Sequence, residues 1–313
     1  MIVLGTGGTI AGLATDAGDN VGYSAAQVGV DELLRGVASA SGCLESEQVA
    51  QIDSKDMSGA IWRRLAERVA HHLARAEVAG IVVTHGTDTL EETAFFLHRL
   101  LAPTKPVVLT GAMRPASSLQ ADGPQNLSDA IAVAADPRAR GVVVVFAGSV
   151  HGSEDVRKVH PYRLDAFSSG DSGPVARIEE GSLRCLRPWP QGSALGLDAL
   201  ARSGWAWPAV EILTSCAGAG GGVVRALLAA GVRGIVAAGT GNGSLHHDLE
   251  VALREAEAAG VAVLRSSRCL DGRIVGGRSA DPLPSAGGMT PVQARIELML
   301  RLMTAGAVRP ASA

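Results

Sequence analysis

Residues 81–101 read IVVTHGTDTLEETAFFLHRLL and indicate how this chain folds. The run Ile81–His85 begins with consecutive apolar, mostly β-branched side chains, which are typical of a strand covered on both faces of a sheet. The run Leu90–Leu101 has a helical pattern, and a short turn that contains glycine joins the two. The segment therefore predicts one strand–turn–helix unit of an α/β protein.

The same alternation continues along the chain. Further buried strands are predicted at residues 2–5, 107–111, 142–147, 210–214, 235–239 and 261–265. Helices are predicted at residues 57–76, 125–134, 222–230, 247–259 and 291–303. Strands that alternate with helices predict an α/β fold with a mainly parallel sheet.

The length of 313 residues favours two domains. Residues 184–208 differ in composition from the rest, since they hold three of the four tryptophans and three prolines. We predict a larger N-terminal catalytic domain at residues 1–187, a linker at 188–208, and a smaller flavodoxin- or Rossmann-like C-terminal domain at 209–313.

Composition excludes several classes of protein. Apolar residues make up 47% and charged residues 19%, which argues against disorder. The net charge of −3 gives no electrostatic reason to expect nucleic acid or an anionic membrane as partner. The longest apolar run, Val142–Ala147, is too short to span a bilayer, and the N-terminus lacks the basic region of a signal peptide. We expect a cytoplasmic protein, or a periplasmic one whose signal peptide has been removed.

Four cysteines, Cys43, Cys185, Cys216 and Cys269, lie far apart and form no CxxC pair. Their spacing gives little support for zinc or redox chemistry, so we expect small buried apolar residues in a reducing compartment. We expect neither a metal nor a cofactor.

Glycine-, threonine- and serine-rich turns follow several predicted strands: GTGGT, THGTDT, TGAMR and GTGNGS. In open α/β sheets, ligands bind at the carboxyl ends of the strands. The turns are therefore where we expect the chemistry of this protein.

The first of these turns, residues 5–12, reads GTGGTIAG. Its glycines allow a sharp turn and close approach of a ligand, and Thr9 is expected to expose its hydroxyl at the end of the strand. The alternative is a phosphate-binding loop. However, Ile10 stands where a dinucleotide fingerprint has its third glycine, and there is no Walker lysine.

The second turn, residues 84–94, reads THGTDTLEETA. A threonine or aspartate followed by glutamate at a helix start is also a good N-cap, which explains one hydroxyl and one acid. An N-cap does not explain why three threonines, a histidine and an aspartate lie within six positions. We therefore expect a polar site beside Thr9. Lys158, in the later run DVRK, by itself resembles an ordinary solvated charge.

The segments GTGGTIAG, VTHGTDTLEETA, VVLTGAMRP, ADGPQNL, GNGSL and SSR resemble the signature runs of bacterial-type L-asparaginases, the asparaginase/glutaminase family. They occur in the same order and extend from Gly5 to Arg268. The resemblance implies an amidohydrolase that converts L-asparagine to L-aspartate and ammonia through a threonine acyl-enzyme, with scope for weaker glutaminase activity.

The resemblance also implies the catalytic residues. Thr9 matches the primary nucleophile, and Tyr23 matches a tyrosine on a mobile lid. Thr87 and Asp88 match a second threonine with its acid, and Lys158 completes a Thr–Lys–Asp group. A threonine hydroxyl needs a base, and a desolvated lysine held against Asp88 can serve as one.

Further matches imply substrate-binding residues. Ser54 corresponds to the serine that binds the α-carboxylate, and Ala112 to the residue whose carbonyl accepts from the substrate amide. Asn242 corresponds to an asparagine contributed across a subunit interface. Asp88 is also expected to bind the substrate ammonium, while Gly8 and Gly86 lie on turns whose N–H groups can form an oxyanion hole.

Two positions depart from the pattern. Lys55 follows Ser54 where relatives commonly carry an acceptor for the substrate amino group, and two ammonium groups repel each other. Residues 271–289 lack the late glutamate of many members and have only Asp271 and Asp281 as acids. Either Lys55 points away or the amino group is recognised differently, so we expect weaker substrate binding and poorer use of glutamine.

The resemblance implies a homotetramer, a dimer of dimers, in which the C-terminal domain of one chain closes the pocket of another. We expect a small-molecule substrate, and neither nucleic acid nor a membrane as partner. Two alternatives are kept. An asparaginase-like tRNA amidotransferase subunit is disfavoured because the chain begins at the catalytic strand and is not basic. A non-catalytic metabolite-binding α/β protein would use GTGGT or GTGNGS as a phosphate cradle.

Overall fold

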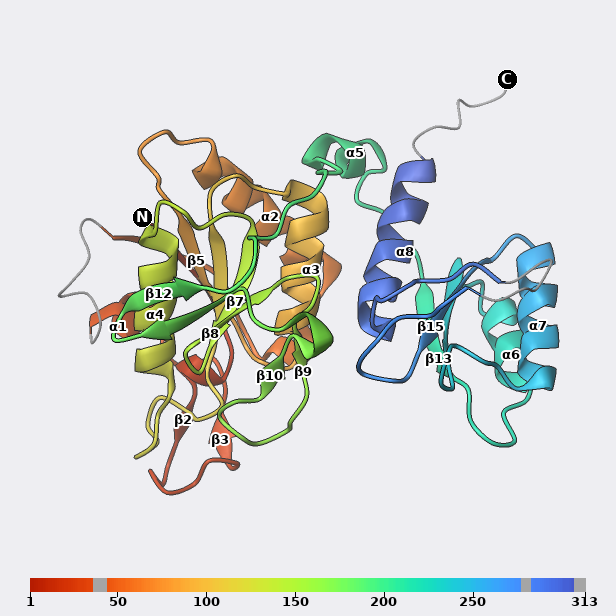
Figure 1. Ribbon diagram of the computed structural model, residues 1–313, viewed down its shortest axis with the longest axis horizontal. Coiled ribbons are helices and arrows are strands. Elements are labelled where there is room, and N and C mark those ends of the chain that lie inside the picture. Colours follow the sequence, from red (N-terminus) through yellow and green to blue (C-terminus); the bar gives the residue numbers. More distant parts are fainter. Residues whose placement is uncertain (36–43, 277–282, 307–313) are drawn as a thin grey trace. The chain divides into compact units, whose positions relative to one another are not determined.

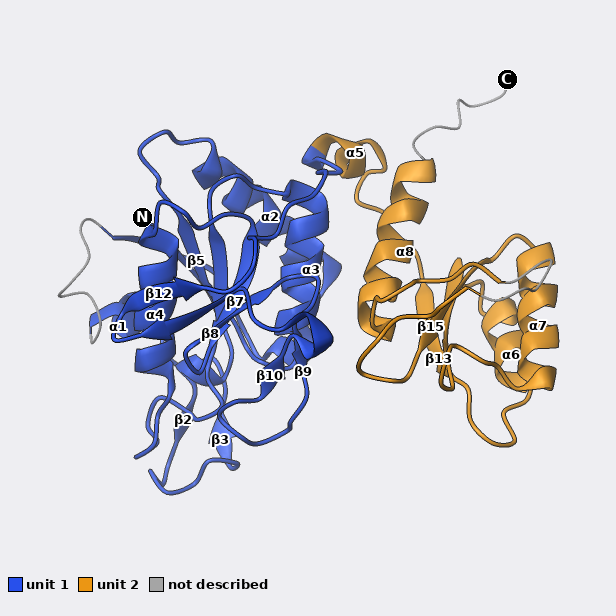
Figure 2. Ribbon diagram, in the orientation of Figure 1, with its two compact units in different colours: residues 1–197 blue, residues 198–313 orange. Residues whose placement is uncertain are grey.

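The computed structural model describes residues 1–35, 44–276 and 283–306 (Figure 1). These residues form two compact units, 1–197 and 198–313 (Figure 2). The division falls within the segment 188–208 that we predicted as a linker, and that segment also contains a short helix, α5 (Leu197–Arg202).

The first unit is built on an eight-stranded sheet with the order β12-β11-β8-β7-β6-β5-β1-β4. Its parallel part consists of β1 (Ile2–Gly7), β4 (Glu45–Ile52), β5 (Ile81–Thr84), β6 (Val107–Thr110) and β7 (Val142–Phe146). Three antiparallel strands extend one edge, namely β8 (Ser149–Gly152), β11 (Ala176–Glu179) and β12 (Ser182–Cys185). Because β1, β5 and β6 are adjacent and parallel, the turns that follow them meet at one edge.

Helices cover both faces of this sheet (Figure 1). One face is covered by α1 (Val30–Arg35) and α4 (Gly123–Ala135), and the other by α2 (Gly59–Leu73) and α3 (Leu90–Leu101). Val3, Val82 and Val108, one from each central strand, pack in one buried cluster with Leu127 and Ile131 of α4. Burial of such side chains contributes ~1.5–3 kcal/mol each, which makes the sheet a firm base for its turns.

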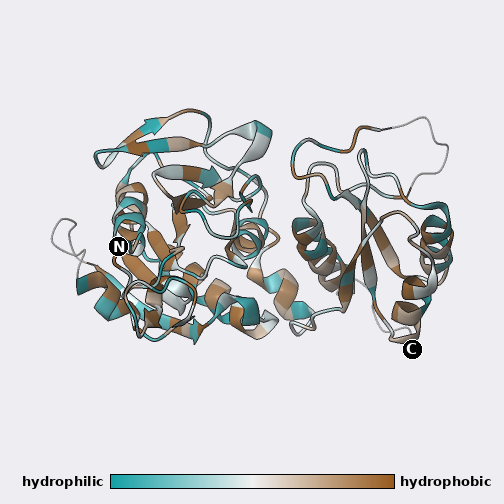
Figure 3. Cartoon of the chain, turned by 90° about the horizontal axis from the view of Figure 1, so that it is seen from below, coloured by the Kyte–Doolittle hydropathy of each residue, from teal (hydrophilic) through white to brown (hydrophobic). Residues whose placement is uncertain are grey.

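The second unit has a three-stranded parallel sheet, β13 (Val210–Thr214), β14 (Gly234–Gly239) and β15 (Ala262–Ser267). Two helices, α6 (Gly222–Ala229) and α7 (His247–Ala258), cover one face, and α8 (Pro291–Gly306) covers the other (Figure 1). Hydrophobic segments gather on the strands of each unit (Figure 3). The α/β fold with a smaller C-terminal domain is confirmed.

The cysteine prediction was wrong for the residues that can be described. Cys185, Cys216 and Cys269 are exposed free thiols, while Cys43 lies outside the described residues. Cys185 ends the edge strand β12, and the other two lie in the turns after β13 and β15, where the core no longer covers them. Within the described ranges, no group of three or more His, Cys, Asp or Glu side chains could hold a metal ion.

No helix among residues 1–35, 44–276 and 283–306 is long and apolar enough to cross a membrane.

Candidate active site

The turn after β1 places Thr9 directly against the turn after β5. Gly7 and Gly8 have φ angles of 99° and 83°, which favour glycine, and Thr9 then begins a short 3₁₀ helix, Thr9–Ala11. A Cβ atom on Gly8 would lie 2.3 Å from the Cα atom of Gly86. The two backbones are therefore in contact, and only a glycine fits there.

The Thr9 hydroxyl is covered, whereas the sequence predicted an exposed one. Thr9 is 8% exposed, and its Oγ1 atom lies 2.7 Å from the phenol oxygen of Tyr23. Tyr23 belongs to a small hairpin of β2 (Leu13–Ala14) and β3 (Tyr23–Ser24), which passes over the turn. The prediction failed because the hairpin follows the nucleophile in sequence but folds back onto it.

A neighbouring loop holds the hairpin segment that carries Tyr23. The amide of Ala14 donates to Ser117 Oγ at 2.8 Å, and Ser118 Oγ donates to Asn20 Oδ1 at 2.6 Å. The hairpin segment is thus hydrogen-bonded in the position that brings Tyr23 to Thr9.

A second hydroxyl centre is formed by Thr87, Asp88 and Lys158. The Lys158 ammonium donates to Thr87 Oγ1 at 3.0 Å and to Asp88 Oδ1 at 2.6 Å. The Lys158 side chain is 19% exposed and that of Asp88 55%. Lys158 is therefore not an ordinary surface charge, because it is largely covered and joined to a turn 70 residues away.

Ser54 lies against the same turn. It is buried, its hydroxyl accepts from the Asp88 amide at 3.2 Å, and its carbonyl accepts from the Thr89 hydroxyl at 2.8 Å. Thr89 occupies the N-cap position of α3, but its side chain makes no capping hydrogen bond. The N-cap interpretation therefore does not account for the threonines of this segment.

Lys55 is held by the carboxylates of its own turn. Its ammonium bonds to Asp53 and lies 4.0 Å from Asp56, and the side chain is 62% exposed. The hydrogen bond to Asp53 is the main cause that raises the Lys55 pKa, and the negative charge of Asp88 adds a smaller effect. Lys55 is thus turned toward Asp53, yet remains within the field of Asp88.

The turn that carries Ala112 is fixed by Asp122 and Asn126, two residues of the ADGPQNL motif for which the sequence analysis predicted no role. Asn126 donates to the Gly111 carbonyl at 3.0 Å and accepts from the Ala147 amide at 3.0 Å. The Asp122 carboxylate accepts from the amides of Met113 and Arg114. These bonds hold Ala112, itself fully buried, at the end of β6.

His85 has a structural role that could not be deduced from the sequence. Its Nδ1 atom lies 2.7 Å from the Gly86 carbonyl, which can only accept, so Nδ1 carries the proton. Its Nε2 atom then accepts from Thr93 Oγ1 at 2.9 Å, and Trp62 donates to that same oxygen. Burial lowers the pKa of His85 to about 4, so the imidazole is neutral at pH 7 and supports the Gly86 turn.

Gly8 contributes to the site by being small enough to let two turns approach each other. Its amide donates to the Ile52 carbonyl at 2.9 Å, so this N–H is already used within the protein. Gly86 is likewise confined, because a Cβ atom there would lie 2.5 Å from Ser54 Oγ. Both glycines bring the turns of Thr9, Ser54 and Thr87 together.

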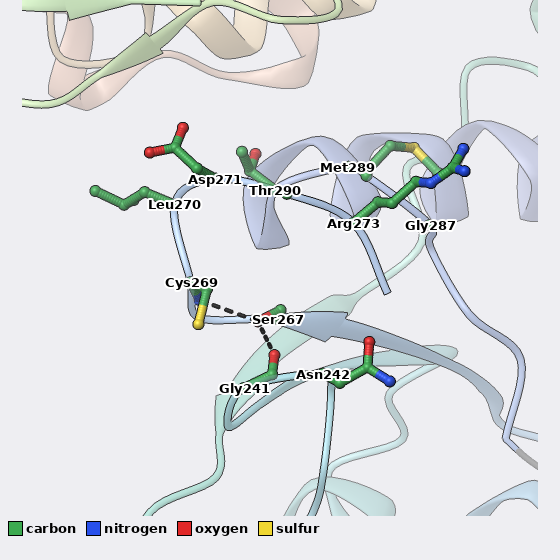
Figure 4. Close-up of a pocket in the computed structure, with 12 residues that line it drawn as sticks. Gly241, Asn242, Ser267, Cys269, Leu270, Asp271, Arg273, Gly287, Met289 and Thr290 are labelled. Carbon is green, nitrogen blue, oxygen red and sulfur yellow. Dashed lines mark hydrogen bonds between the residues drawn. The ribbon is translucent and has the colours of Figure 1, made fainter. Parts of the chain in front are cut away.

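Asn242 belongs to the second unit, in the turn after β14. Its side-chain amide donates to the Val275 carbonyl at 3.0 Å and accepts from the Val275 amide at 2.7 Å. It lines a cavity of about 250 Å³ together with Asp271, Arg273 and Thr290 (Figure 4). Asp281, the other late acid, lies outside the described residues.

Comparison with known proteins agrees with this arrangement. Residues 1–191 match the family model described as Asparaginase, N-terminal, and residues 209–308 match the Glutaminase/Asparaginase C-terminal domain. The chain belongs to the asparaginase family.

Relatives and a solved structure match nearly the whole chain. The glutaminase-asparaginase of Pseudomonas fluorescens biotype A is 36% identical and covers 96% of this chain and 86% of its own length. L-asparaginase 2 of Escherichia coli strain K12 is 36% identical, with 96% and 88% covered. The crystal structure of a probable cytoplasmic L-asparaginase from Campylobacter jejuni superposes with a TM-score of 0.90 at 35% identity, covering 99% of each chain.

Proposed function

We propose that this protein hydrolyses the side-chain amide of L-asparagine to L-aspartate and ammonia, and that of glutamine more slowly. One observation carries the proposal. Two activated hydroxyl centres, Thr9 with Tyr23 and Thr87 with Lys158 and Asp88, lie on backbone turns that touch at Gly8 and Gly86. The names of the relatives, L-asparaginase and glutaminase-asparaginase, support this substrate class.

In the first half-reaction, Thr9 Oγ1 attacks the carbon of the side-chain amide. Its proton passes to the Tyr23 oxygen, 2.7 Å away, and onward to the leaving nitrogen. The carbon–nitrogen bond breaks, ammonia leaves, and an ester joins Thr9 to the aspartyl group. Backbone N–H groups of the surrounding turns stabilise the oxyanion, and one such donor contributes ~3–4 kcal/mol in other enzymes.

In the second half-reaction, water attacks the ester carbon and releases aspartate. Thr87, hydrogen-bonded to Lys158, orients this water. The proton that the water loses passes through the Lys158–Asp88 pair. The proton returns to Thr9, so the enzyme ends as it began. Asparagine and water are consumed, and aspartate and ammonia are formed.

The substrate backbone is held by the groups around the two centres. Ser54, which lies against the Gly86 turn, binds the α-carboxylate, and Asp88 binds the α-ammonium with the part of its carboxylate that faces solvent. The Ala112 carbonyl accepts from the amide nitrogen. Asn242 acts from a neighbouring chain, where it shapes the cavity wall by its bonds to Val275.

A substrate assay with purified protein tests this function. We expect one ammonia and one aspartate for each asparagine consumed, with a lower kcat/KM for glutamine. The assay contains no tRNA or ATP, so it also distinguishes hydrolysis from the work of an amidotransferase subunit. Absence of ammonia release from asparagine under these conditions would refute the proposal.

We also infer a cytoplasmic location and a homotetramer. The exposed thiols Cys185, Cys216 and Cys269 suit a reducing compartment, and the Campylobacter jejuni structure is described as cytoplasmic. A relative from Haemophilus influenzae, 35% identical, is described as periplasmic. Fractionation of cells tests the location, and recovery of the protein with periplasmic markers would refute it.

A further inference from the structure

We propose that Glu91 is a positioning residue for this reaction, which fixes the backbone of Lys158 so that the lysine ammonium reaches Thr87 and Asp88. The proposal rests on the function proposed above for Lys158. Glu91 lies in the first turn of α3, and its carboxylate accepts a hydrogen bond from the Lys158 amide, 67 residues away.

Lys158 is carried by a short strand outside the large sheet. It ends β9 (Arg157–Lys158), which forms a separate two-stranded sheet with β10 (Phe167–Ser168). There Lys158 is paired with Phe167, and the next amide, that of Val159, donates to the Ala166 carbonyl at 2.8 Å. A strand of two residues has few ladder bonds, so an additional contact matters for its position.

The start of α3 holds both ends of Lys158. Thr87 and Asp88 bind the ammonium, and Glu91 binds the main-chain amide. A lysine side chain has four flexible carbon–carbon bonds, so fixing the ammonium alone leaves the backbone free to shift. With both ends bound to one helix start, the lysine ammonium and the Thr87 hydroxyl move together, as preorganised catalysis requires.

The charge of Glu91 adds a pH dependence to this contact. Burial raises the pKa of the Glu91 carboxyl to about 7, against the lowering effects of the Lys158 amide and of the charges on Arg157 and Lys158. Glu92, beside it on α3, raises the pKa further. Above pH 7 the carboxylate is ionised and accepts strongly. Below pH 7 it is protonated, and the hydrogen bond to Lys158 weakens.

Ionisation of Glu91 strengthens its hydrogen bond to Lys158, but because the pKa is raised the same ionisation destabilises the folded protein. A glutamate whose pKa is raised on folding destabilises the folded protein as pH rises from about 4.5 through about 7, because the unfolded chain loses its proton first. Glu91→Gln removes this penalty. The difference in melting temperature between Glu91→Gln and wild type should therefore increase as pH rises through this range and stay constant above it.

Glu91 has a competing explanation as a helix stabiliser only. Acidic residues in a first helical turn interact favourably with the helix dipole, and α3 has two, Glu91 and Glu92. Glu92→Gln removes the same charge from the same turn and therefore serves as the matched control.

The experiment compares wild type with Glu91→Ala, Glu91→Gln and Glu92→Gln. It records kcat and KM for asparagine from pH 5.5 to 9, and amide hydrogen exchange in residues 157–159. We expect Glu91→Ala to lower kcat by roughly 10- to 100-fold with little change in KM, and to speed exchange at Lys158. Glu91→Gln keeps an acceptor oxygen, so it should lose less kcat but lack the ionisation near pH 7. Glu92→Gln should behave as wild type.

The proposal is overturned if Glu91→Ala keeps wild-type kcat, if exchange at Lys158 is unchanged, or if Glu92→Gln loses as much kcat. Should Glu91→Ala not fold, Glu91→Gln decides by its pH profile, and an unchanged ionisation near pH 7 overturns the proposal. A wild-type protein without asparaginase activity would refute the proposed function. The exchange rates would still show whether Glu91 fixes the Lys158 backbone.

Discussion

At the scale of single residues, we propose that Asp88 binds both Lys158 and the substrate ammonium, whereas Lys158 does not bind the substrate. One of its oxygens binds Lys158, while more than half of the side chain is open to solvent, where the substrate ammonium is proposed to bind. Lys158→Met should therefore lower kcat by about 10³-fold with little effect on KM, since it removes the ammonium group that binds Thr87 and Asp88 and relays the proton of the attacking water.

Asp88→Ala should lower kcat and also raise KM about 10- to 100-fold, because a charge-assisted contact of ~1.5–3 kcal/mol is lost. Steady-state kinetics with asparagine separates the two variants. If both lost the same kcat at unchanged KM, Asp88 would have no part in substrate binding.

Because of its position in the structure, we expect Lys55 to weaken substrate binding less than the sequence alone suggested. Its ammonium is paired with Asp53 and exposed to solvent, so its repulsion of a substrate ammonium beside Asp88 is screened. Lys55→Gln should lower the KM for asparagine by roughly two- to threefold at unchanged kcat. An unchanged or higher KM would mean that Lys55 does not oppose the substrate ammonium.

At the scale of elements, the turn after β1 depends on Gly8. Alanine there would combine a left-handed φ of 83° with a Cβ atom 2.3 Å from the Gly86 backbone. We expect Gly8→Ala to lower the free energy of unfolding by about 3 kcal/mol or more and to abolish activity.

Gly173 provides the matched control, because its φ of 65° is also left-handed but its Cβ position is open. Gly173→Ala should cost less than Gly8→Ala, ~1–3 kcal/mol, which is the backbone strain alone. Denaturant unfolding measures both variants. Equal losses would show that contact between the two turns contributes nothing.

The central strands could be predicted because they are continuously apolar. The predicted strand at 210–214 and helix at 90–101 agree with β13 and α3 to the residue. The edge strand β4 was missed, since five of the eight residues of ESEQVAQI are polar and only Val49 and Ala50 are buried. The short antiparallel strands β8, β11 and β12 also lack a long apolar run, although β8 is buried along its whole length.

The site could be predicted only where a motif lies within one local segment. Thr9, Thr87 and Asp88 were predicted in this way, and Ser54 and Lys158 through the family resemblance. The contact between Glu91 and Lys158 joins residues 67 apart, and the bond between His85 and Thr93 depends on how α3 follows its strand. Contacts of this kind arise from tertiary packing, which a local pattern does not encode.

At the scale of the whole molecule, we predict that activity requires assembly. Thr9 and Asn242 belong to different units, and the family resemblance implies that Asn242 acts in a neighbouring chain. Chains that carry Thr9→Ala and chains that carry Asn242→Ala should each be impaired. When they are unfolded and refolded together, sites with both residues intact should form and restore part of the activity.

Light scattering at the assay concentration should show a homotetramer. A fully active monomer would contradict this prediction, as would a mixture of the two variants that is no more active than its components.

The proposed reaction depends on nucleophilic attack by Thr9, which the variant Thr9→Ala removes. Thr9→Ser, which keeps a hydroxyl, is the matched control, and circular dichroism should show the same fold in both variants. We predict that ammonia release from asparagine falls by at least about 10³-fold in Thr9→Ala and remains measurable in Thr9→Ser. Near-normal ammonia release by folded Thr9→Ala would contradict the assignment of Thr9 as the nucleophile.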